Sequence, residues 1–258
     1  MRILVSGAGS GLGRHVAAAL GGVPFLRGDA VEAFARESME PFDAIVHCAF
    51  NAMRSVPWDR LVDYMSDNAL LTARLQQIPH RMFIYVSTVD LYPRDGKIHD
   101  EASDIRAENL HGAYAVTKFY GEALVRAGAA PWVILRPTSL LGPYARRSTL
   151  ARVLESPESV VGLSGDSRYN AVLHEDVAQF IQLAIEHRLS GVYNIASSDD
   201  ISLDEIAKAF DRRVTFGDHH YSAPRLDNSR ATAVLPAFGR STLDTLRLYA
   251  RRCGLENS

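Results

Sequence analysis

The first two thirds of the chain alternate between short apolar runs and longer stretches with helical periodicity. Such alternation predicts a parallel sheet with helices on both faces, because the chain has to cross back over the sheet between successive parallel strands. The strands are expected at 2–6, 23–27, 43–49, 81–88 and 132–137, and the helices between them at 12–20, 31–39, 58–77 and 113–128.

The pattern loosens after Pro137, where residues 138–170 are rich in Gly, Pro, Ser and Arg. A strand is expected at 191–196, and helices at 175–187, 203–210 (after Ser202 as N-cap) and 242–253. Because ligands bind at the carboxyl ends of the strands in open α/β sheets, a lobe placed there would complete a pocket. We therefore expect a main domain of residues 1–137 with parts of 171–196, and a smaller substrate-binding lobe of residues 138–170 and 197–258.

A glycine-rich turn, SGAGSGLG at 6–13, joins the first strand to the first helix. Residues without a Cβ let a pyrophosphate approach the backbone and rest on the N-terminus of the helix. A few glycines alone are a weak signal, but the order strand, turn, helix is the context that dinucleotide binding requires. The turn predicts a doubly wound, Rossmann-like α/β fold that binds a dinucleotide, and the alternative is a tight turn without a ligand.

Tyr114 stands four residues before Lys118 in a stretch that is expected to be helical. Residues at i and i+4 lie on the same helix face, so a phenol and an ammonium group are held side by side. Such a pair is either an ordinary surface contact or the proton-transfer device of an enzyme, and its spacing alone does not distinguish the two.

Composition argues against several other classes of protein. The 258 residues carry a net charge of −2 without a long run of one sign, which argues against a nucleic-acid or membrane-binding surface. No apolar run is long enough to span a membrane, and Met1 leads directly into the first strand, so no signal peptide is expected. The two cysteines, Cys48 and Cys253, suggest neither a disulfide framework nor a metal site, which fits a reducing cytoplasm.

Several segments resemble the extended branch of the short-chain dehydrogenase/reductase superfamily, which contains nucleotide-sugar epimerases, dehydratases and reductases. The motifs that carry the resemblance are G-x-x-x-G-x-G from Gly7, AIVHCAF at 44–50, DNALLTARL at 67–75, FIYVSTVDLYP at 83–93, the Tyr114/Lys118 pair, ILRPTSLLGP at 134–143, and segments at 170–181 and 192–207. The chain is short for that branch, and we expect one strand–helix unit to be missing around Asp29.

The resemblance implies a catalytic triad of Thr88, Tyr114 and Lys118. Tyr114 would exchange a proton with the substrate, Thr88 would hold the same substrate oxygen, and Lys118 would lower the pKa of Tyr114 and bind the nicotinamide ribose. The residues expected at an NAD(P) site are Tyr114 and Lys118 together with Gly7, Gly9, Ser10, Gly11, Leu12, Gly13, Arg27, Asp29, Cys48, Ala49, Phe50, Asn68, Val86, Ser87 and Pro137. Those expected to bind the substrate, a nucleotide sugar, are Asp90, Ser139, Arg146 and Arg168.

The choice between NAD and NADP stays open at this stage. Arg27 either holds a 2′-phosphate or is plain surface, and Asp29 is placed to bind adenine or a ribose hydroxyl. Arg14, next to the glycine turn, adds a slight lean toward NADP.

Val89 follows Thr88 directly, at the position where sugar-nucleotide 4,6-dehydratases of this superfamily carry an acid, so dehydration is not expected. The preferred expectation is an NAD(P)-dependent oxidoreductase that acts as a (nucleotide-)sugar ketoreductase. The alternatives are an NAD-dependent sugar-nucleotide epimerase with the same triad, and a non-catalytic dinucleotide-binding sensor. Relatives often dimerise through the helices that correspond to 58–77 and 113–128, so a cytoplasmic homodimer is expected.

Overall fold

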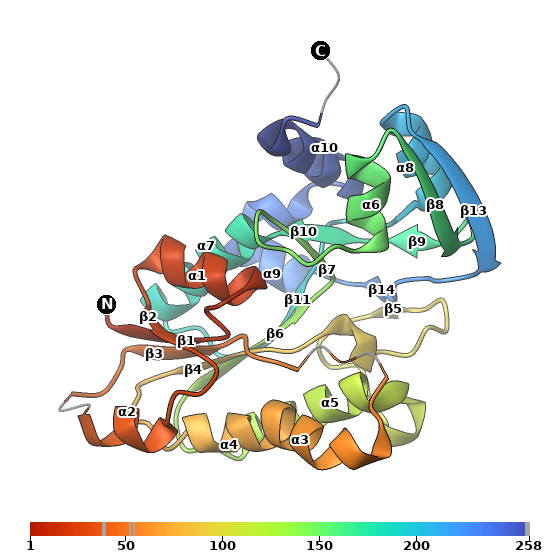
Figure 1. Cartoon of the computed structure of the whole chain (residues 1–258). Coiled ribbons are helices and arrows are strands. Elements are labelled where there is room, and N and C mark those ends of the chain that lie inside the picture. Colours follow the sequence, from red (N-terminus) through yellow and green to blue (C-terminus); the bar gives the residue numbers. More distant parts are fainter. Residues whose placement is uncertain (38–39, 52, 54, 256–258) are drawn as a thin grey trace.

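The centre of the molecule is a parallel sheet of six strands (Figure 1). The computed structural model describes residues 1–37, 40–51, 53 and 55–255. Neighbouring strands of the sheet pair in parallel throughout, so the predicted Rossmann-like α/β class is confirmed. In spatial order the strands are β11 (Gly191–Ile195), β6 (Trp132–Pro137), β4 (Phe83–Val86), β3 (Ala44–His47), β1 (Ile3–Ser6) and β2 (Val23–Phe25).

The inner strands β1, β3 and β4 consist entirely of buried side chains, as expected for a sheet covered on both faces. At the edge, β2 has three residues with Pro24 in the middle, and one helix, α2 (Val31–Glu37), leads from it to β3. Between α1 and β3 the chain therefore has only one strand, β2, and one helix, α2, in the region around Asp29 where a shortening was expected. Residues 38–39, which the sequence placed in this helix, lie outside the described residues.

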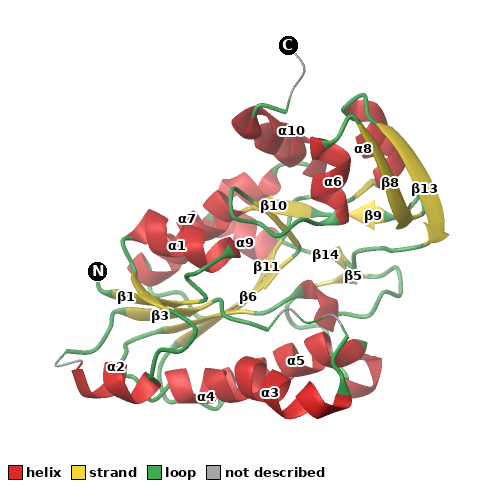
Figure 2. Cartoon of the chain, viewed as in Figure 1, coloured by secondary structure: helices red, strands yellow, loops and turns green. Residues whose placement is uncertain are grey.

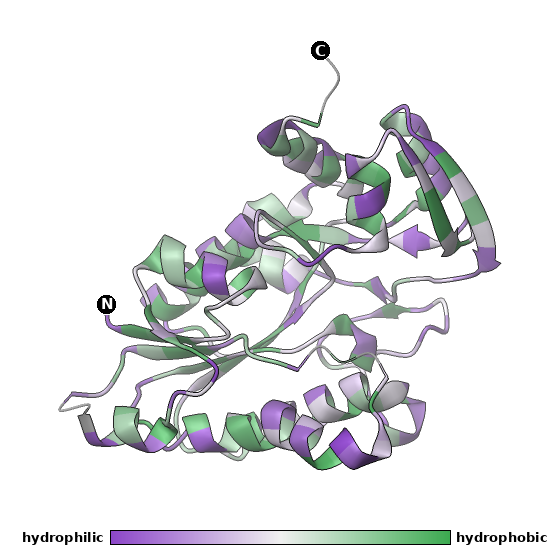
Figure 3. Ribbon diagram, in the orientation of Figure 1, coloured by the Kyte–Doolittle hydropathy of each residue, from purple (hydrophilic) through white to green (hydrophobic). Residues whose placement is uncertain are grey.

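Helices cover the two faces of the sheet, and Figure 3 shows the sheet between them as mainly hydrophobic. On one face lie α1 (Gly11–Leu20), α7 (His174–Glu186) and α9 (Ser229–Val234), whose buried residues share a core with the sheet. On the other face lie α2, the helical segment 58–75 and α5 (Gly112–Arg126), which pack with Leu4, Ile45 and Phe83. No helix in the described ranges is long and apolar enough to cross a membrane.

The segment predicted as one helix at 58–77 is interrupted by a π turn. It comprises η1 (Trp58–Arg60), α3 (Leu61–Met65), the π turn η2 (Ser66–Leu70) and α4 (Leu71–Leu75). Turns of this kind occur mostly as single insertions in α-helices and are frequent at functional sites. Here the π turn contains Asp67, which lines the cavity described below, and the buried Asn68.

The lobe at the carboxyl end of the sheet is built from α6 (Thr149–Glu155), α8 (Leu203–Ala209) and α10 (Thr242–Cys253) around a second apolar core (Figure 2). The helices expected at 203–210 and 242–253 are confirmed, and Ser202 caps α8. Short strand pairs tie distant segments together: β8 (Glu158–Leu163) with β13 (Arg213–His219), β9 (Arg168–Tyr169) with β12 (Ile201–Ser202), β10 (Ala171–Leu173) with β7 (Ser139–Leu141), and β14 (Arg225–Leu226) with β5 (Ile98–His99).

Part of the segment that the sequence assigned to the lobe packs against the sheet. Ala231, Leu235 and Phe238 belong to the same apolar cluster as β1, β3 and α7. The cause is α9, which contacts β11 and closes that edge of the sheet. The division into a main domain and a substrate-binding lobe stays a prediction, and residues 229–239 pack with the main domain.

Candidate active site

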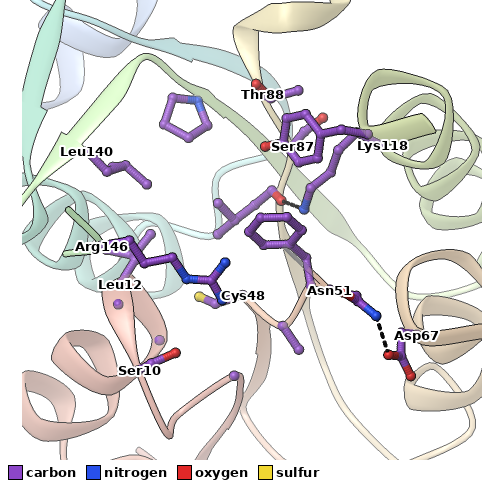
Figure 4. A pocket seen from close by; sticks show the side chains of 18 of the residues that line it. Ser10, Leu12, Cys48, Asn51, Asp67, Ser87, Thr88, Lys118, Leu140 and Arg146 are labelled. Atoms are coloured by element: carbon purple, nitrogen blue, oxygen red, sulfur yellow. Dashed lines mark hydrogen bonds between the residues drawn. The ribbon is translucent and has the colours of Figure 1, made fainter. Parts of the chain in front are cut away.

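A cavity of about 1080 Å³ opens at the carboxyl ends of the strands, between the sheet and the lobe. Each inner strand delivers residues to its wall directly after it ends: Gly7 after β1, Cys48 after β3, Ser87 after β4 and Thr138 after β6. The cavity therefore lies where the fold class predicts a ligand. Figure 4 shows Ser10 and Leu12 at one side of it, Asp67 at another, and Thr88 and Lys118 farther along.

The glycine turn is packed tightly on one side and open on the other. A Cβ on Gly7 would lie 2.7 Å from Ala49 N, and one on Gly13 would lie 2.5 Å from the carbonyl oxygen of Gly7. By contrast, a Cβ on Gly9 would meet nothing closer than 3.9 Å. Gly7 and Gly13 thus bring the backbone close to β3 and to α1, while Gly9 leaves space in the cavity. This is the cradle that a pyrophosphate on a helix N-terminus needs.

A buried chain of hydrogen bonds anchors this turn. His47 lies between two hydroxyl groups: its Nδ1 is 2.6 Å from Ser6 Oγ, and its Nε2 is 3.0 Å from Thr72 Oγ1. Ala49 N–H donates to Ser6 Oγ, and Thr72 Oγ1 donates to the carbonyl of Asn68, so one neutral tautomer, with the proton on Nε2, satisfies every member. Burial, with a smaller contribution from the charge of Lys118, lowers the pKa of His47 to about 3.

The end of the cavity beyond β2 is lined by charged residues. Arg27 Nη2 forms an ion pair of 2.6 Å with Asp67 Oδ2, and Asn51 Nδ2 donates to the same oxygen at 2.9 Å. The carboxylate of Asp29 accepts from Leu26 N–H at 2.7 Å and so closes its own turn. Arg74, from α4, lines the same cavity and pairs with Glu32.

The three residues of the expected triad meet at the end of β4. Thr88 follows the strand, and Tyr114 and Lys118 come from one face of α5. The Thr88 side chain lies close enough to the Tyr114 phenol to act on it. Lys118 Nζ, which is buried, donates to the carbonyl of Val86 at 2.7 Å (Figure 4). Lys118 is therefore buried and Tyr114 half-buried in the cavity wall, so the pair is not an exposed surface contact.

The expected lowering of the Tyr114 pKa is not seen in the protein alone. Burial raises the pKa of Tyr114, the carboxylate of Asp90 raises it further, and the hydrogen bond from Thr88 opposes the change. The ammonium of Lys118 is directed to Val86 instead, and burial lowers the pKa of Lys118 to about 8. At neutral pH Tyr114 is thus a neutral phenol that can give up a proton.

Beneath the triad lies a network of buried charges. Glu122, one helical turn after Lys118, accepts two hydrogen bonds from Arg136, at 2.8 and 2.7 Å, and one from Ser87 Oγ at 2.7 Å. Burial works against the charged carboxylate, but the bonds from Arg136 and Ser87 hold the pKa of Glu122 below its usual value. Ser87 lies between Val86, whose carbonyl binds Lys118, and Thr88. The bond from Ser87 to Glu122 therefore holds the end of β4 in place.

A strap formed by residues 142–148 crosses from the lobe to the glycine turn. The carbonyl of Tyr144 accepts from Gly11 N–H at 3.0 Å, and Arg14 stacks on the Tyr144 ring at 4.2 Å. Arg146 extends from the strap into the cavity toward Cys48, and its guanidinium lies 5.4 Å from the ring centre of Phe50 (Figure 4). No carboxylate in the described part of the chain forms an ion pair with Arg146.

Most residues selected from the sequence line this one cavity. They include the triad, the six residues of the turn, Arg27, Asp29, Cys48, Ala49, Phe50, Val86, Ser87, Pro137, Asp90, Ser139 and Arg146. Two do not reach it. Asn68 lies behind the wall and accepts from Asn51 N–H at 2.6 Å. Arg168 lines a separate shallow pocket, where its guanidinium forms ion pairs with Asp200 and Glu205.

Sequence reasoning missed several other lining residues, among them Asp67, Arg74, His174, Tyr221 and Ala223. No motif marked Tyr221 and Ala223, which the fold brings in from the far end of the chain. Asp67 is directly next to the asparagine that was selected, and the π turn is what gives Asp67 rather than Asn68 access to the cavity.

The parallel sheet and the glycine turn on α1 define a Rossmann-type fold, and Thr88, Tyr114 and Lys118 line its cavity. The sequence matches the model of the NAD-dependent epimerase/dehydratase family over residues 3–196, and the chain belongs to that family. A search of curated proteins finds no match.

Solved structures of similar fold come from several kinds of enzyme. MoeE5, in complex with UDP-glucuronic acid and NAD, is 19% identical with a TM-score of 0.79, covering 98% of this chain and 100% of its own. A dTDP-4-dehydrorhamnose reductase from Clostridium acetobutylicum is 18% identical with a TM-score of 0.82, over 98% and 100% of the two chains. TunA, an NAD-dependent NDP-hexosamine 5,6-dehydratase, is 17% identical with a TM-score of 0.79, over 99% and 98%. These likenesses establish the fold.

Proposed function

We propose that this protein is an NAD(P)-dependent ketoreductase that acts on a sugar nucleotide or a similar hydroxylated carbonyl compound. The observation that carries the proposal is that Thr88, Tyr114 and Lys118 line one cavity together with the glycine turn. Reduction of a carbonyl needs a proton donor at the oxygen, and a phenol with a raised pKa is in the right protonation state. Solved structures of similar fold include a dTDP-4-dehydrorhamnose reductase and complexes with UDP-sugars, which supports the substrate class.

Each side chain has one task in this reaction. When bound, the nicotinamide supplies a hydride to the carbonyl carbon. Tyr114 gives its phenolic proton to the carbonyl oxygen, and hydride and proton together convert the ketone to an alcohol. Thr88 holds the same oxygen with its hydroxyl group. Lys118, anchored on the carbonyl of Val86, would bind the nicotinamide ribose, and its positive charge would stabilise the phenolate that proton transfer leaves on Tyr114.

The residues of the cavity fit a nicotinamide dinucleotide. The open face of the glycine turn suits the pyrophosphate, and the region of Arg27, Asp67 and Arg74 suits the adenosine half. We favour NADP over NAD, because Arg27 and Arg74 both line this region while Asp29 is engaged in its own turn. Measuring dissociation constants for NADPH and NADH by fluorescence titration decides between the two cofactors.

The test of the function removes the phenolic hydroxyl group of Tyr114. Tyr114→Phe keeps the ring but removes the proton, so we expect turnover of dTDP-4-keto sugars with NADPH to fall about a hundredfold to ten-thousandfold while NADPH binding is retained. Tyr120→Phe is the matched control, because Tyr120 lies on the same helix with its side chain exposed to solvent. Unchanged turnover in Tyr114→Phe contradicts the mechanism.

The alternative functions differ in how they treat the cofactor. An epimerase would use the same residues but oxidise and reduce the sugar in place, so denaturing the purified protein would release about one NAD per chain. A reductase uses the cofactor as a co-substrate and would be isolated largely without it. Tight cofactor binding without hydride exchange with any carbonyl would favour the non-catalytic sensor.

A homodimer forms part of the same proposal. Trp58 and Val62 are 88% and 80% exposed, and Tyr120 is 54% exposed on the neighbouring helix α5. Large apolar side chains that gather on one face often mark an interface. Light scattering of the purified protein should give twice the mass of the 28.4 kDa chain.

A further inference from the structure

Asp90 is joined to the expected reaction centre by two contacts with Thr88. It lies in the 3-10 turn η3 (Val89–Leu91), its N–H donates to Thr88 Oγ1 at 3.2 Å, and its Oδ2 is 3.4 Å from the same oxygen. The side chain is 34% exposed and lines the cavity. Its negative charge acts on Tyr114 as well, so both hydroxyl groups that would hold the substrate oxygen have a carboxylate beside them.

Tyr221 completes this end of the cavity from the other half of the molecule. The segment that carries it is held by the backbone of Arg168, which donates to the carbonyl of Tyr221 at 2.8 Å and accepts from Ala223 N–H at 3.0 Å. The guanidinium of Arg94 lies 4.9 Å from the centre of the Tyr221 ring and donates to Asp90 Oδ1 at 2.8 Å. Arg94 thus connects Asp90 to Tyr221. Burial raises the pKa of the Tyr221 phenol, and the charge of Asp90 raises it further.

The cation of this group is turned away from the space that a substrate would occupy. Asp90, Tyr221 and Ala223 line the cavity, whereas Arg94 does not appear in that wall as far as the described residues define it. Both faces that Arg94 offers are in use, one by the Asp90 carboxylate and one by the Tyr221 ring. A ligand that enters this end therefore meets an acceptor-only carboxylate and a phenol rather than a free guanidinium.

We propose that Asp90 and Tyr221 form a specificity subsite that takes a hydroxyl, hydroxymethyl or ammonium substituent on the substrate carbon next to the reacting carbon, and that excludes a carboxylate there. A hydroxyl or ammonium donates a hydrogen bond to Asp90, whereas a carboxylate brings a like charge to it without a proton to share. The substrate class is accordingly a neutral or amino sugar and not a uronic acid. This inference rests on the proposed function and narrows its substrate.

Two probes that differ only at this group test the subsite. UDP-glucose carries a hydroxymethyl group on the carbon next to C4, and UDP-glucuronic acid carries a carboxylate there. Titration calorimetry of the protein saturated with NADP should show UDP-glucose binding at least about tenfold more tightly than UDP-glucuronic acid, which is the scale of one unfavourable charge contact. Asp90→Asn keeps the shape and removes the charge, so the ratio of the two dissociation constants should fall at least about fivefold.

The control is Asp104→Asn, which removes the same charge from a side chain that is 73% exposed and pairs only with Arg106 in the described structure. In this variant the ratio of the dissociation constants for UDP-glucuronic acid and UDP-glucose should equal that of the unmodified protein. Equal or tighter binding of UDP-glucuronic acid by the unmodified protein, or an unchanged ratio in Asp90→Asn, overturns the subsite while leaving the proposed function intact. If the protein binds NADP but neither sugar nucleotide, the sugar-nucleotide function itself is overturned, and the subsite with it.

Discussion

Two helices of this protein begin in opposite ways. α1 begins after Ser10, and among the described residues no side chain caps its first N–H groups. α8 begins after Ser202 with a complete capping box, in which Ser202 and Glu205 satisfy each other's backbone donors. An uncapped helix start leaves donors and a partial positive charge for a ligand, whereas a capping box uses them for stability. The start of α1 thus has no side-chain partner for its N–H groups, whereas the start of α8 is satisfied within the lobe.

The largest effect should come from filling the turn in front of α1. Gly13→Val places a branched side chain where a Cβ alone would already lie 2.5 Å from the carbonyl of Gly7. Since both sides of this contact are backbone, we expect a loss of at least about 3 kcal/mol in the free energy of unfolding and no measurable NADPH binding. Urea unfolding and fluorescence titration measure the two quantities.

Gly9→Ala is the matched control for stability, because its Cβ would be 3.9 Å from the nearest atom. Its melting temperature should stay within about a degree of the unmodified protein. Equal stability of Gly13→Val and Gly9→Ala would mean that the turn is not tightly packed.

The buried His47 should make the cofactor half sensitive to acid. Its pKa in the folded protein, about 3, lies below the ordinary 6.5, so only the unfolded chain takes up a proton as the pH falls between these values. This contribution to stability is complete above pH 6.5 and decreases toward pH 3. We expect unfolding free energy to fall by about 2 kcal/mol between pH 6.5 and pH 5, at about 1.36 per pH unit.

Urea unfolding of His47→Gln across that pH range isolates the effect, since the variant lacks the titrating ring. Its unfolding free energy should depend less steeply on pH than that of the unmodified protein, whatever its stability at pH 7. His111→Gln, at an exposed position, should keep the original slope. Parallel curves for His47→Gln and the unmodified protein would refute a neutral buried imidazole.

The smallest effect concerns the two caps themselves. Ser202→Ala removes one half of the capping box and should cost about 1 kcal/mol of stability without changing NADPH binding. Ser10→Ala should leave stability within about 0.5 kcal/mol, because the Ser10 side chain makes no cap bond within the described structure. Equal losses in the two variants, measured by urea unfolding, would contradict the difference between the helices.

The parts of the fold that the sequence predicts are those governed by local patterns. The inner strands and the helices α1, α5, α7, α8 and α10 follow from apolar periodicity, and the turn at 6–13 from its glycines. The paired strands of the lobe were not predicted. Most of them have two or three residues, which carry no period, and the longer pair of β8 and β13 joins segments far apart in the chain.

The same division holds for the site. Tyr114 and Lys118 lie on the helix α5, and Thr88 comes shortly after the end of β4, so their motifs place them correctly in the cavity wall. Tyr221 lines the cavity on a segment that is hydrogen-bonded to the backbone of Arg168. The side chain of Arg168 itself points away from the cavity and pairs with Asp200. A motif identifies the residue but not the side to which its chain points. The pKa of Tyr114 escaped prediction for a related reason, because burial and Asp90 are properties of the assembled site.

The edge strand β2 has a consequence for how the molecule behaves among its neighbours. Unpaired backbone groups along an edge recruit strands from other molecules and lead to aggregation, and a proline there removes a donor. β2 is three residues long with Pro24 at its centre, and the opposite edge, β11, is contacted by α9. The edge on the cofactor side is therefore short and lacks one backbone donor, so we expect it to be a poor template for edge-to-edge association.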